Sequence, residues 1–469
     1  MIKKIFFKEL KEMIRDGRIR LLFFIVICLT GLSLLIKINH YKEINRQYES
    51  ATISEREVWD NQGEKNPHSA SHFGTYAFKP KYPLSLIDQG VDKYIGTSIF
   101  LESHKRNEAQ FSAASDQTGL SRFGDLSPDF ILLFIVPLLT IFLGFNSFTK
   151  EIEMGTFVLL KSQGVNKWKW MIGKWFALFV PILALTVILF FIAGIILSNL
   201  NNFGLYNWSS LISLTITYII YYIIFINLIL FISFQSKKSS ISLVICLSIW
   251  ILSCLVAPKL ASNYAEEKYP YPTKQEFQES ISIDKKNGLD GHDPWSKEAK
   301  LLEQKVLKEY NVDSLHKLPF NFAAYRTQKG EEHEAKVYLK HYKFLKEQFN
   351  KQSNIYKNLA VISPFLPTRF LSMAISNTDY ASHWDFSDTA ENYRIEMQKF
   401  LNDNTSQNTK YGERGYKADA KFWKTLNQFK YDPPELGIKL NENISNILIL
   451  IVWTFLSFSL YLSSKLEKL

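Results

Sequence analysis

Nine histidines are the side chains of this sequence best suited to bind a metal ion or to transfer protons, but their spacing matches no metal motif. His333-Glu334 is followed by His341, so the second histidine of an H-E-x-x-H zinc motif is missing. His292-Asp293 stands in the sequence as an isolated pair. No glycine-flanked nucleophile of the hydrolase type occurs either. The pattern predicts no metal, no catalytic residues, and histidines that are solvated or hydrogen-bonded.

Nucleotide binding through a P-loop needs glycines before a Lys-Ser or Lys-Thr pair, and no G-x-x-x-x-G-K-[ST] occurs. Gly173-Lys174 is followed by Trp175 and lacks the earlier glycine. An ATP-driven process would therefore need a second polypeptide to bind the nucleotide.

A charged segment at residues 149–175, between two apolar stretches, is the most informative part of the sequence. It contains Glu151, Glu153, Gly155, Thr156, Lys161, Gly164 and Lys174. It resembles the segment of type-2 ABC transporter permeases in which an acidic pair and Gly-Thr precede a short helix that docks on the nucleotide-binding subunit. The N-terminal segment, with Lys8, Glu9, Arg15 and Asp16, resembles the connecting helix of that family. The alternative is a generic charged loop beside a membrane-surface helix.

Two further regions narrow this resemblance to a subgroup with two large extracytoplasmic insertions. The first runs from His72 to Gly96, and the second includes Leu318-Pro-Phe-Asn321, Ser363-Pro364 and Thr378-Asp379. The resemblance implies a non-catalytic permease subunit that pairs with itself or a similar permease. It also implies an ATP-binding ABC subunit as partner, which holds the ATP and Mg²⁺.

Six apolar stretches place these motifs in a membrane protein. Residues 21–36, 130–148, 176–197, 211–234, 241–256 and 444–462 meet or approach the roughly 20 residues that a bilayer-spanning helix needs. No span has an ionisable residue in its interior, which argues against a transporter that moves protons through its own helices. The sequence thus predicts an all-α polytopic membrane protein with six transmembrane helices.

Lys and Arg gather in the N-terminal arm, the loops at 149–175 and 237–238, and the C-terminal tail with Lys465 and Lys468. The positive-inside rule assigns these segments, and both termini, to the cytoplasm of a bacterial inner membrane. They account for the whole net charge of +10, so the basic composition reports orientation and not nucleic-acid binding.

The expected organisation is an interfacial helix at 1–20, a first span at 21–38, an insertion at 39–128, spans two to five at 129–257, a second insertion at 258–443, and a last span with its tail at 444–469. Helix-forming composition after the first span is compatible with a helix that projects past the membrane. Residues 60–128 are expected to be irregular. In the second insertion we expect helices at 297–310, 330–356, 387–401 and 417–429, a Pro-marked segment at 363–373, and a capping box formed by Asp388 and Glu391.

Three functions follow. The first is the permease of an ATP-driven exporter of unidentified substrate. The second keeps the ATP-driven motor but transmits its motion to a periplasmic or outer-membrane partner. The third is a membrane-anchored extracytoplasmic enzyme or receptor, for which the sequence offers no catalytic constellation.

Overall fold

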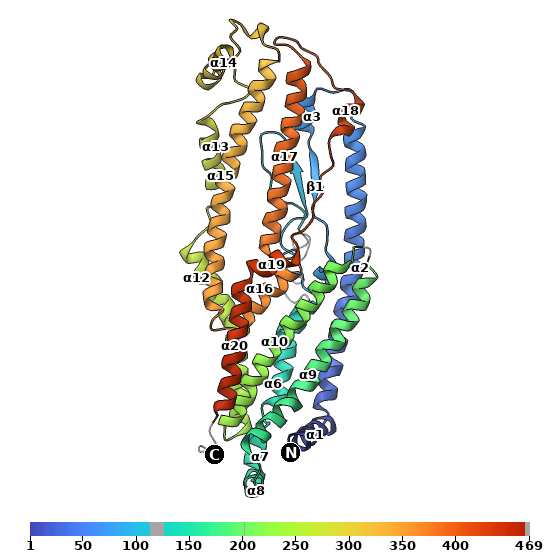
Figure 1. Ribbon diagram of the computed structural model, residues 1–469, viewed down its shortest axis with the longest axis vertical. Coiled ribbons are helices and arrows are strands. Elements are labelled where there is room, and N and C mark those ends of the chain that lie inside the picture. Colours follow the sequence, from blue (N-terminus) through green and yellow to red (C-terminus); the bar gives the residue numbers. More distant parts are fainter. Residues whose placement is uncertain (113–125, 201, 465–469) are drawn as a thin grey trace.

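Helices form nearly all of the computed structural model, which describes residues 1–112, 126–200 and 202–464 (Figure 1). Six of them are long and apolar enough to cross a membrane, and each contains one of the six apolar stretches: Arg18–Asp60, Pro128–Glu153, Lys167–Ser198, Asn207–Gln235, Ser239–Lys268 and Ile444–Ser463. Over the described residues the protein is a multi-pass membrane protein that is mostly helical and has one small sheet of two strands.

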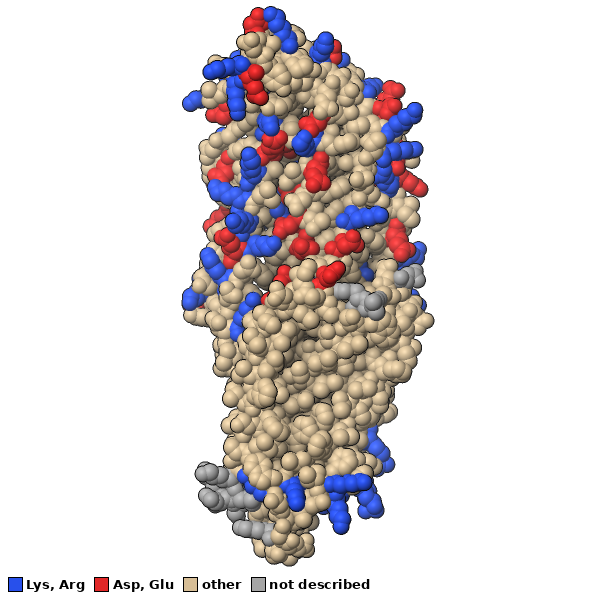
Figure 2. Space-filling view, viewed as in Figure 1, with Lys and Arg blue, Asp and Glu red and all other residues tan. Residues whose placement is uncertain are grey.

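The membrane-spanning helices pack into one bundle. Its elements are α2 (Arg18–Asp60), α5 (Pro128–Phe130) with η2 (Ile131–Ile135) and α6 (Val136–Gly144), α9 (Lys167–Ser198), α10 (Leu205–Gln235), α11 (Ser239–Ile251) with η3 (Leu252–Val256), and α20 (Ile444–Ser463). Figure 2 shows an uncharged band over this bundle, with acidic and basic side chains above it and basic side chains gathered at the lower end. That banding is what a bilayer around the bundle requires.

Tyrosine hydroxyls satisfy backbone carbonyls where the second span is irregular. Pro137 has no N–H, so the carbonyl of Leu133, four residues earlier, loses its helical donor. The buried Tyr221 hydroxyl donates to that carbonyl at 3.0 Å, and the Tyr222 hydroxyl donates to the carbonyl of Leu132 at 2.9 Å. Both carbonyls lie in the π-helical turn η2, so α10 stabilises an irregularity that lipid alone would penalise.

The chain outside the bundle forms an elongated distal domain, from the described parts of 39–127 and 258–443 (Figure 1). It contains α3 (Pro67–Phe73), η1 (Pro83–Leu86), α12 (Ala257–Lys268), α13 (Lys274–Lys286), α14 (Lys297–Glu309), η4 (Leu315–Lys317), α15 (Phe322–Leu359), α16 (Phe365–Ile375), α17 (Tyr380–Asn408), α18 (Ala420–Thr425) and α19 (Leu436–Glu442). Strands β1 (Thr75–Phe78) and β2 (Ser98–Leu101) pair antiparallel, with Thr75 opposite Leu101. Both insertions share one apolar core, in which Trp59 and Ile99 pack with Phe386 and Trp423.

Helix α16 joins the distal domain to the bundle, and it carries a buried charged residue that lies outside the six expected spans. It packs against α10 and α20. Its Arg369 guanidinium lies 3.1 Å from the buried Asp88 carboxylate and 2.6 Å from that of Asp129, at the start of the second span. Ser372 donates a second hydrogen bond to Asp88. This buried network ties both insertions to the top of the bundle.

The boundaries expected at 38/39 and 257/258 fall inside α2 and the Ser239–Lys268 helix, because both helices continue past their apolar residues, as the composition after the first span allowed. Some expected helix bounds in the second insertion differ from those of the structure. Residues 363–373 mostly form α16, since prolines are tolerated at a helix start. The expected helix at 417–429 shrinks to α18, Ala420–Thr425.

The helix expected at 387–401 begins earlier, as α17 at Tyr380. Its N-cap is Asp379, whose carboxylate accepts from the backbone N–H of Ser382 at 3.0 Å. The predicted capping box is therefore wrong. Asp388 lies within the helix and binds Arg106 at 2.8 Å and Lys346 at 2.9 Å.

Candidate coupling site

The lower end of the molecule brings together the N-terminal helix α1 (Ile2–Arg15), the loop helices α7 (Thr149–Glu153) and α8 (Thr156–Ser162), and α9 (Figure 1). Helix α1 packs along the start of α9. The contact depends on Gly173, since a Cβ there would lie 2.8 Å from the Cβ of Ile5. The Gly173-Lys174 pair, which does not match a phosphate-binding motif, therefore lies where α1 and α9 pack together. This packing places Lys174 next to α1.

Lys174 is the centre of an ion-pair cluster that includes four of the predicted site residues. Its ammonium, 2% exposed, lies 3.0 Å from the Glu9 carboxylate and 3.2 Å from that of Glu151. Lys8 lies 2.9 Å from Glu9 and 3.1 Å from Glu151. We call Lys8, Glu9, Glu151 and Lys174 the coupling cluster. It joins α1, α7 and α9 through alternating charges.

The charges of the coupling cluster stabilise one another. Burial alone would raise the pKa of the Glu9 carboxyl, but the ammonium groups of Lys174 and Lys8 outweigh it and hold the pKa below its usual range. Burial works to lower the pKa of Lys8, yet Glu9 and Glu151 raise it well above normal. The charged forms of Glu9 and Lys8 are thus favoured. The cluster lines a cavity of about 440 Å³ that also includes Asn146.

Glu153, the other half of the acidic pair, serves a different contact. Its carboxylate accepts from the backbone N–H of Ser239 at 2.8 Å and from the Ser239 hydroxyl at 2.6 Å, at the first turn of α11. A carboxylate is favourable at a helix N-terminus. The two carboxylates therefore have different partners. Glu151 pairs with lysines of α1 and α9, and Glu153 binds the start of the fifth span.

Gly155 and Thr156 turn the chain from α7 into α8. Gly155 has a φ of +69°, which side chains with a Cβ rarely adopt, and the Thr156 hydroxyl donates to the Glu151 carbonyl at 3.3 Å. Helix α8 follows at the lower tip (Figure 1). It and the turn before it expose Met154, Val158 and Leu159 to 60–67%.

The remaining predicted residues lie outside the coupling cluster. Arg15 is exposed, and Asp16 accepts from Arg18 at 2.7 Å. Gly164, at φ +71°, ends the turn after α8. Lys161 lies in α8, but its side chain is outside the described part of the structure, as are Lys465 and Lys468 of the expected tail.

Three residues of this region were missed. Glu12 pairs with Lys150, and Arg18 donates to the Leu143 carbonyl at 3.1 Å and to the Asn146 side chain at 2.9 Å. A signal existed for Glu12, because it stands four residues after Lys8 and so shares its helix face. Nothing in the sequence indicates the Arg18 contacts, which depend on how the second span ends.

This arrangement suits the transfer of force. The coupling cluster consists of two carboxylates and two ammonium groups, paired with one another. Its charges are mutually compensated, and removing one partner of such a buried pair leaves the other uncompensated. A push on α7 and α8 would therefore be resisted together by α1 and α9.

His292 stands apart from the other histidines in the sequence but not in the fold. The fold places its ring beside those of His68, His72 and His104, from distant parts of the sequence.

Comparisons with known proteins give families without an assigned function. Residues 273–432 match a family described as a domain of unknown function, DUF3526. Residues 96–280 match a family described as a protein of unknown function, DUF2705. No curated protein matches the chain.

Proposed function

We propose that this chain is the membrane-spanning subunit of an ATP-driven transporter of the type-2 ABC class, in which a separate subunit binds ATP and Mg²⁺. The observation that carries the proposal is the coupling cluster, since it ties the loop after the second span to both α1 and α9. The chain itself is not an enzyme in this proposal. It lies in a bacterial inner membrane with both termini in the cytoplasm, as a dimer of like or similar chains.

The exposed apolar residues of α8 and its preceding turn support a partner at the lower tip. Met154, Val158 and Leu159 are solvent-exposed there. Met154 and Leu159 line the same cavity as Lys150 and Glu151. Apolar anchors with a charged rim are typical of protein interfaces. The occupant is the ATP-binding subunit. Its closure on ATP would push α7 and α8, and the coupling cluster would pass the movement to α1 and α9.

Purification of the tagged chain from its native membrane tests this proposal. An ATP-binding subunit with ATPase activity should co-purify with the wild-type chain and be lost from Val158→Asp, which places a charge on the exposed apolar face of α8. Ser162→Asp, an exposed polar position on the same helix, is the matched control and should retain the subunit. Recovery without any ATPase would discard the permease assignment.

A second function, transmission of motion to an outer partner, is favoured by α2. This helix runs unbroken for 43 residues from the lower end of the bundle into the distal domain. Its far end is tied to the second insertion, because Arg56 donates to the Leu426 carbonyl at 2.7 Å and the Trp59 indole to the Trp423 carbonyl at 3.1 Å. A partner that binds the distal domain in only one nucleotide state would favour this version, and cargo transport in reconstituted vesicles would favour the first.

A further inference from the structure

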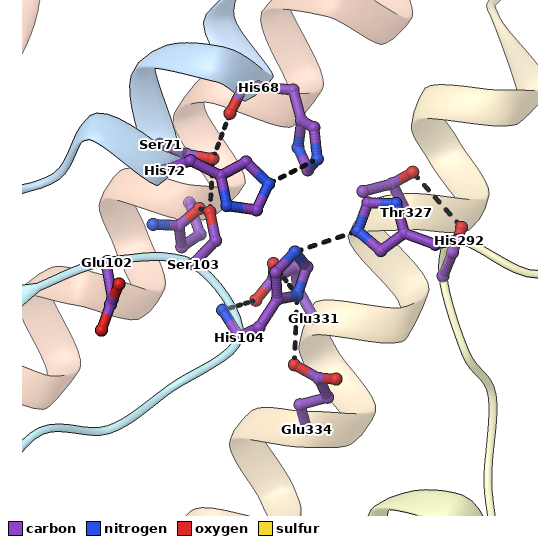
Figure 3. Close-up of polar contacts among 12 residues, drawn as sticks. His68, Ser71, His72, Glu102, Ser103, His104, His292, Thr327, Glu331 and Glu334 are labelled. Atoms are coloured by element: carbon purple, nitrogen blue, oxygen red, sulfur yellow. Dashed lines mark hydrogen bonds and ion pairs between the residues drawn. The ribbon is translucent and has the colours of Figure 1, made fainter.

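Four histidine side chains of the distal domain lie close together (Figure 3). One ring nitrogen from each of His68, His72, His104 and His292 lies within 4.8 Å of the other three. The Nε2 atoms of His68 and His72 are 3.2 Å apart, and those of His104 and His292 are 2.9 Å apart. The four rings thus direct nitrogens into one small space.

Local structure places each of these histidines in the cluster. Asn66 caps α3 by accepting from the backbone N–H groups of His68 and Ser69, and the i, i+4 spacing then puts His68 and His72 on one helix face. His104 follows β2 with a φ of +63°, a conformation that costs energy and aims its ring inward.

His292 reaches the cluster because two glycines allow a close backbone approach. A Cβ on Gly330 would lie 2.4 Å from the backbone nitrogen of Gly291, so the loop before α14 can touch α15 only where both residues are glycine. Arg326 adds a hydrogen bond to the Gly291 carbonyl at 3.1 Å. This contact also explains a glycine inside a long helix.

The outward-facing nitrogens of two rings have acceptors of their own. The Nδ1 of His104 lies 2.8 Å from Glu331 and 3.2 Å from Glu334, both on α15. The Nδ1 of His68 lies 3.3 Å from the Asn402 side-chain oxygen. A carboxylate behind a histidine fixes its orientation and makes it a better metal ligand, and metal sites use this arrangement widely. In the neutral rings of His68 and His104 it leaves the Nε2 lone pair free to face the cluster.

Ring nitrogens this close to one another either share hydrogens or bind a cation. A tetrahedral ion bound at 2.0–2.1 Å, as zinc is by histidine, would set its ligand nitrogens about 3.3 Å apart. The observed Nε2 separations of 3.2 and 2.9 Å are close to that value. An N–H···N hydrogen bond joins only the two rings of one pair, whereas a metal ion would join all four rings. Imidazole ligands suit zinc, copper and nickel rather than magnesium or calcium.

We propose that His68, His72, His104 and His292 bind one divalent transition-metal ion of the zinc or copper class through their Nε2 atoms, with Glu331 and Glu334 orienting His104. Three ligands come from the first insertion and one from the second. The ion therefore clamps the two insertions together. His72 and His292 are exposed, so the ion can reach the site from solvent.

Zn²⁺ binding to the purified, chelator-treated chain in detergent tests the site. Calorimetry and metal analysis should give about one Zn²⁺ per chain, and Co²⁺ should give the visible absorption of a tetrahedral nitrogen site. His292→Ala should weaken Zn²⁺ binding more than tenfold, and Glu331→Gln by about 10–100-fold. His316→Ala, an exposed histidine of the same domain, should bind as the wild type does.

Thermal unfolding gives a second readout that does not depend on one variant. Zn²⁺ should raise the Tm of the wild type and of His316→Ala but not of His292→Ala, and Mg²⁺ should leave all three unchanged. Absence of Zn²⁺ binding to the wild type would overturn the site in favour of a proton-sharing histidine cluster. Equal Zn²⁺ binding by His292→Ala would overturn it too. The chain is tested without nucleotide or partner, so the result is independent of the proposed transporter function.

Discussion

The Lys174 ammonium lies 3.0 Å from the Glu9 carboxylate and 3.2 Å from that of Glu151, so one buried charge fastens the N-terminal helix to the loop after the second span. Lys174→Met keeps the length of the side chain and removes its charge. The two carboxylates then keep only the largely exposed Lys8 as counter-ion, so the change should cost up to about 3–5 kcal/mol. We expect a lower Tm in detergent and loss of ATP turnover in the complex.

Lys169→Met is the matched control for this change, because Lys169 is exposed near the start of the same helix. It should leave both the Tm and the ATP turnover unchanged. Wild-type turnover by Lys174→Met would contradict the role of the coupling cluster.

Gly173 sets the distance between α1 and α9. Gly173→Leu adds a side chain where even a Cβ would lie 2.8 Å from Ile5, so α1 must move away from α9 and the coupling cluster must open. Proteolysis should then release the N-terminal segment at least tenfold faster than in the wild type. Gly31→Leu is the control, since nothing lies within 4 Å of a Cβ at Gly31. Equal cleavage of the two variants would show that α1 does not depend on this contact.

Arg369 should be essential for the junction between the bundle and the distal domain. Arg369→Met leaves Asp88 and Asp129 buried without their counter-ion, which should cost about 3–5 kcal/mol. Adding Asp88→Asn removes one uncompensated charge and should restore part of the loss. Thermal unfolding of the single and double variants measures this coupling, and a double variant less stable than the single one would refute it.

The buried Asp92 predicts how the distal domain responds to acid. Burial alone would raise its pKa, but Lys79, at 2.7 Å, and Lys81 outweigh it, so the folded pKa lies below the unfolded value of about 3.9. The stabilisation is present above that value and is lost as the pH falls through the lower, folded pKa. Asp92→Asn should lower stability at pH 7 and flatten the loss below about pH 4.

Denaturant unfolding across pH measures the Asp92 effect. The exposed Asp313, paired with Lys317, is the control, since Asp313→Asn should change stability little. An unchanged acid dependence in Asp92→Asn would mean that other carboxylates govern it.

The parts of this fold that the sequence predicts are those with a local physical cause. Six apolar runs predict six helices, and Lys174 with Glu151 stands in a charged segment between two of them. The start of α17 was misjudged because capping-box spacing at Asp388 competed with the true cap at Asp379. The start at Tyr380 is favoured by the burial of Trp384 and Phe386, each in its own apolar cluster. A helix that began at 387 would include neither residue.

Contacts between distant segments could not be predicted in the same way. His104 and His292 lie together because the segment after β2 contacts α15 and because two glycines let the loop with His292 approach the same helix. Neither the spacing of residues nor the composition predicts this contact. Arg369 was missed because α16 belongs to an insertion by sequence and to the bundle by packing.

Because helix α2 is unbroken, the directions of the side chains at its two ends are fixed relative to each other. Its 43 residues make a rod about 65 Å long, and each residue is turned about 100° from the one before it. A rotation of the rod at Gly17, where the chain bends into α1, therefore reaches Trp59 with the same angle. Two residues inserted into the rod would turn its far end by about 200°, whereas four would turn it by about 400°, only about 40° from its original direction. If α2 transmits motion as proposed, the movement of the distal domain would depend on the helical register of α2 as well as on its displacement.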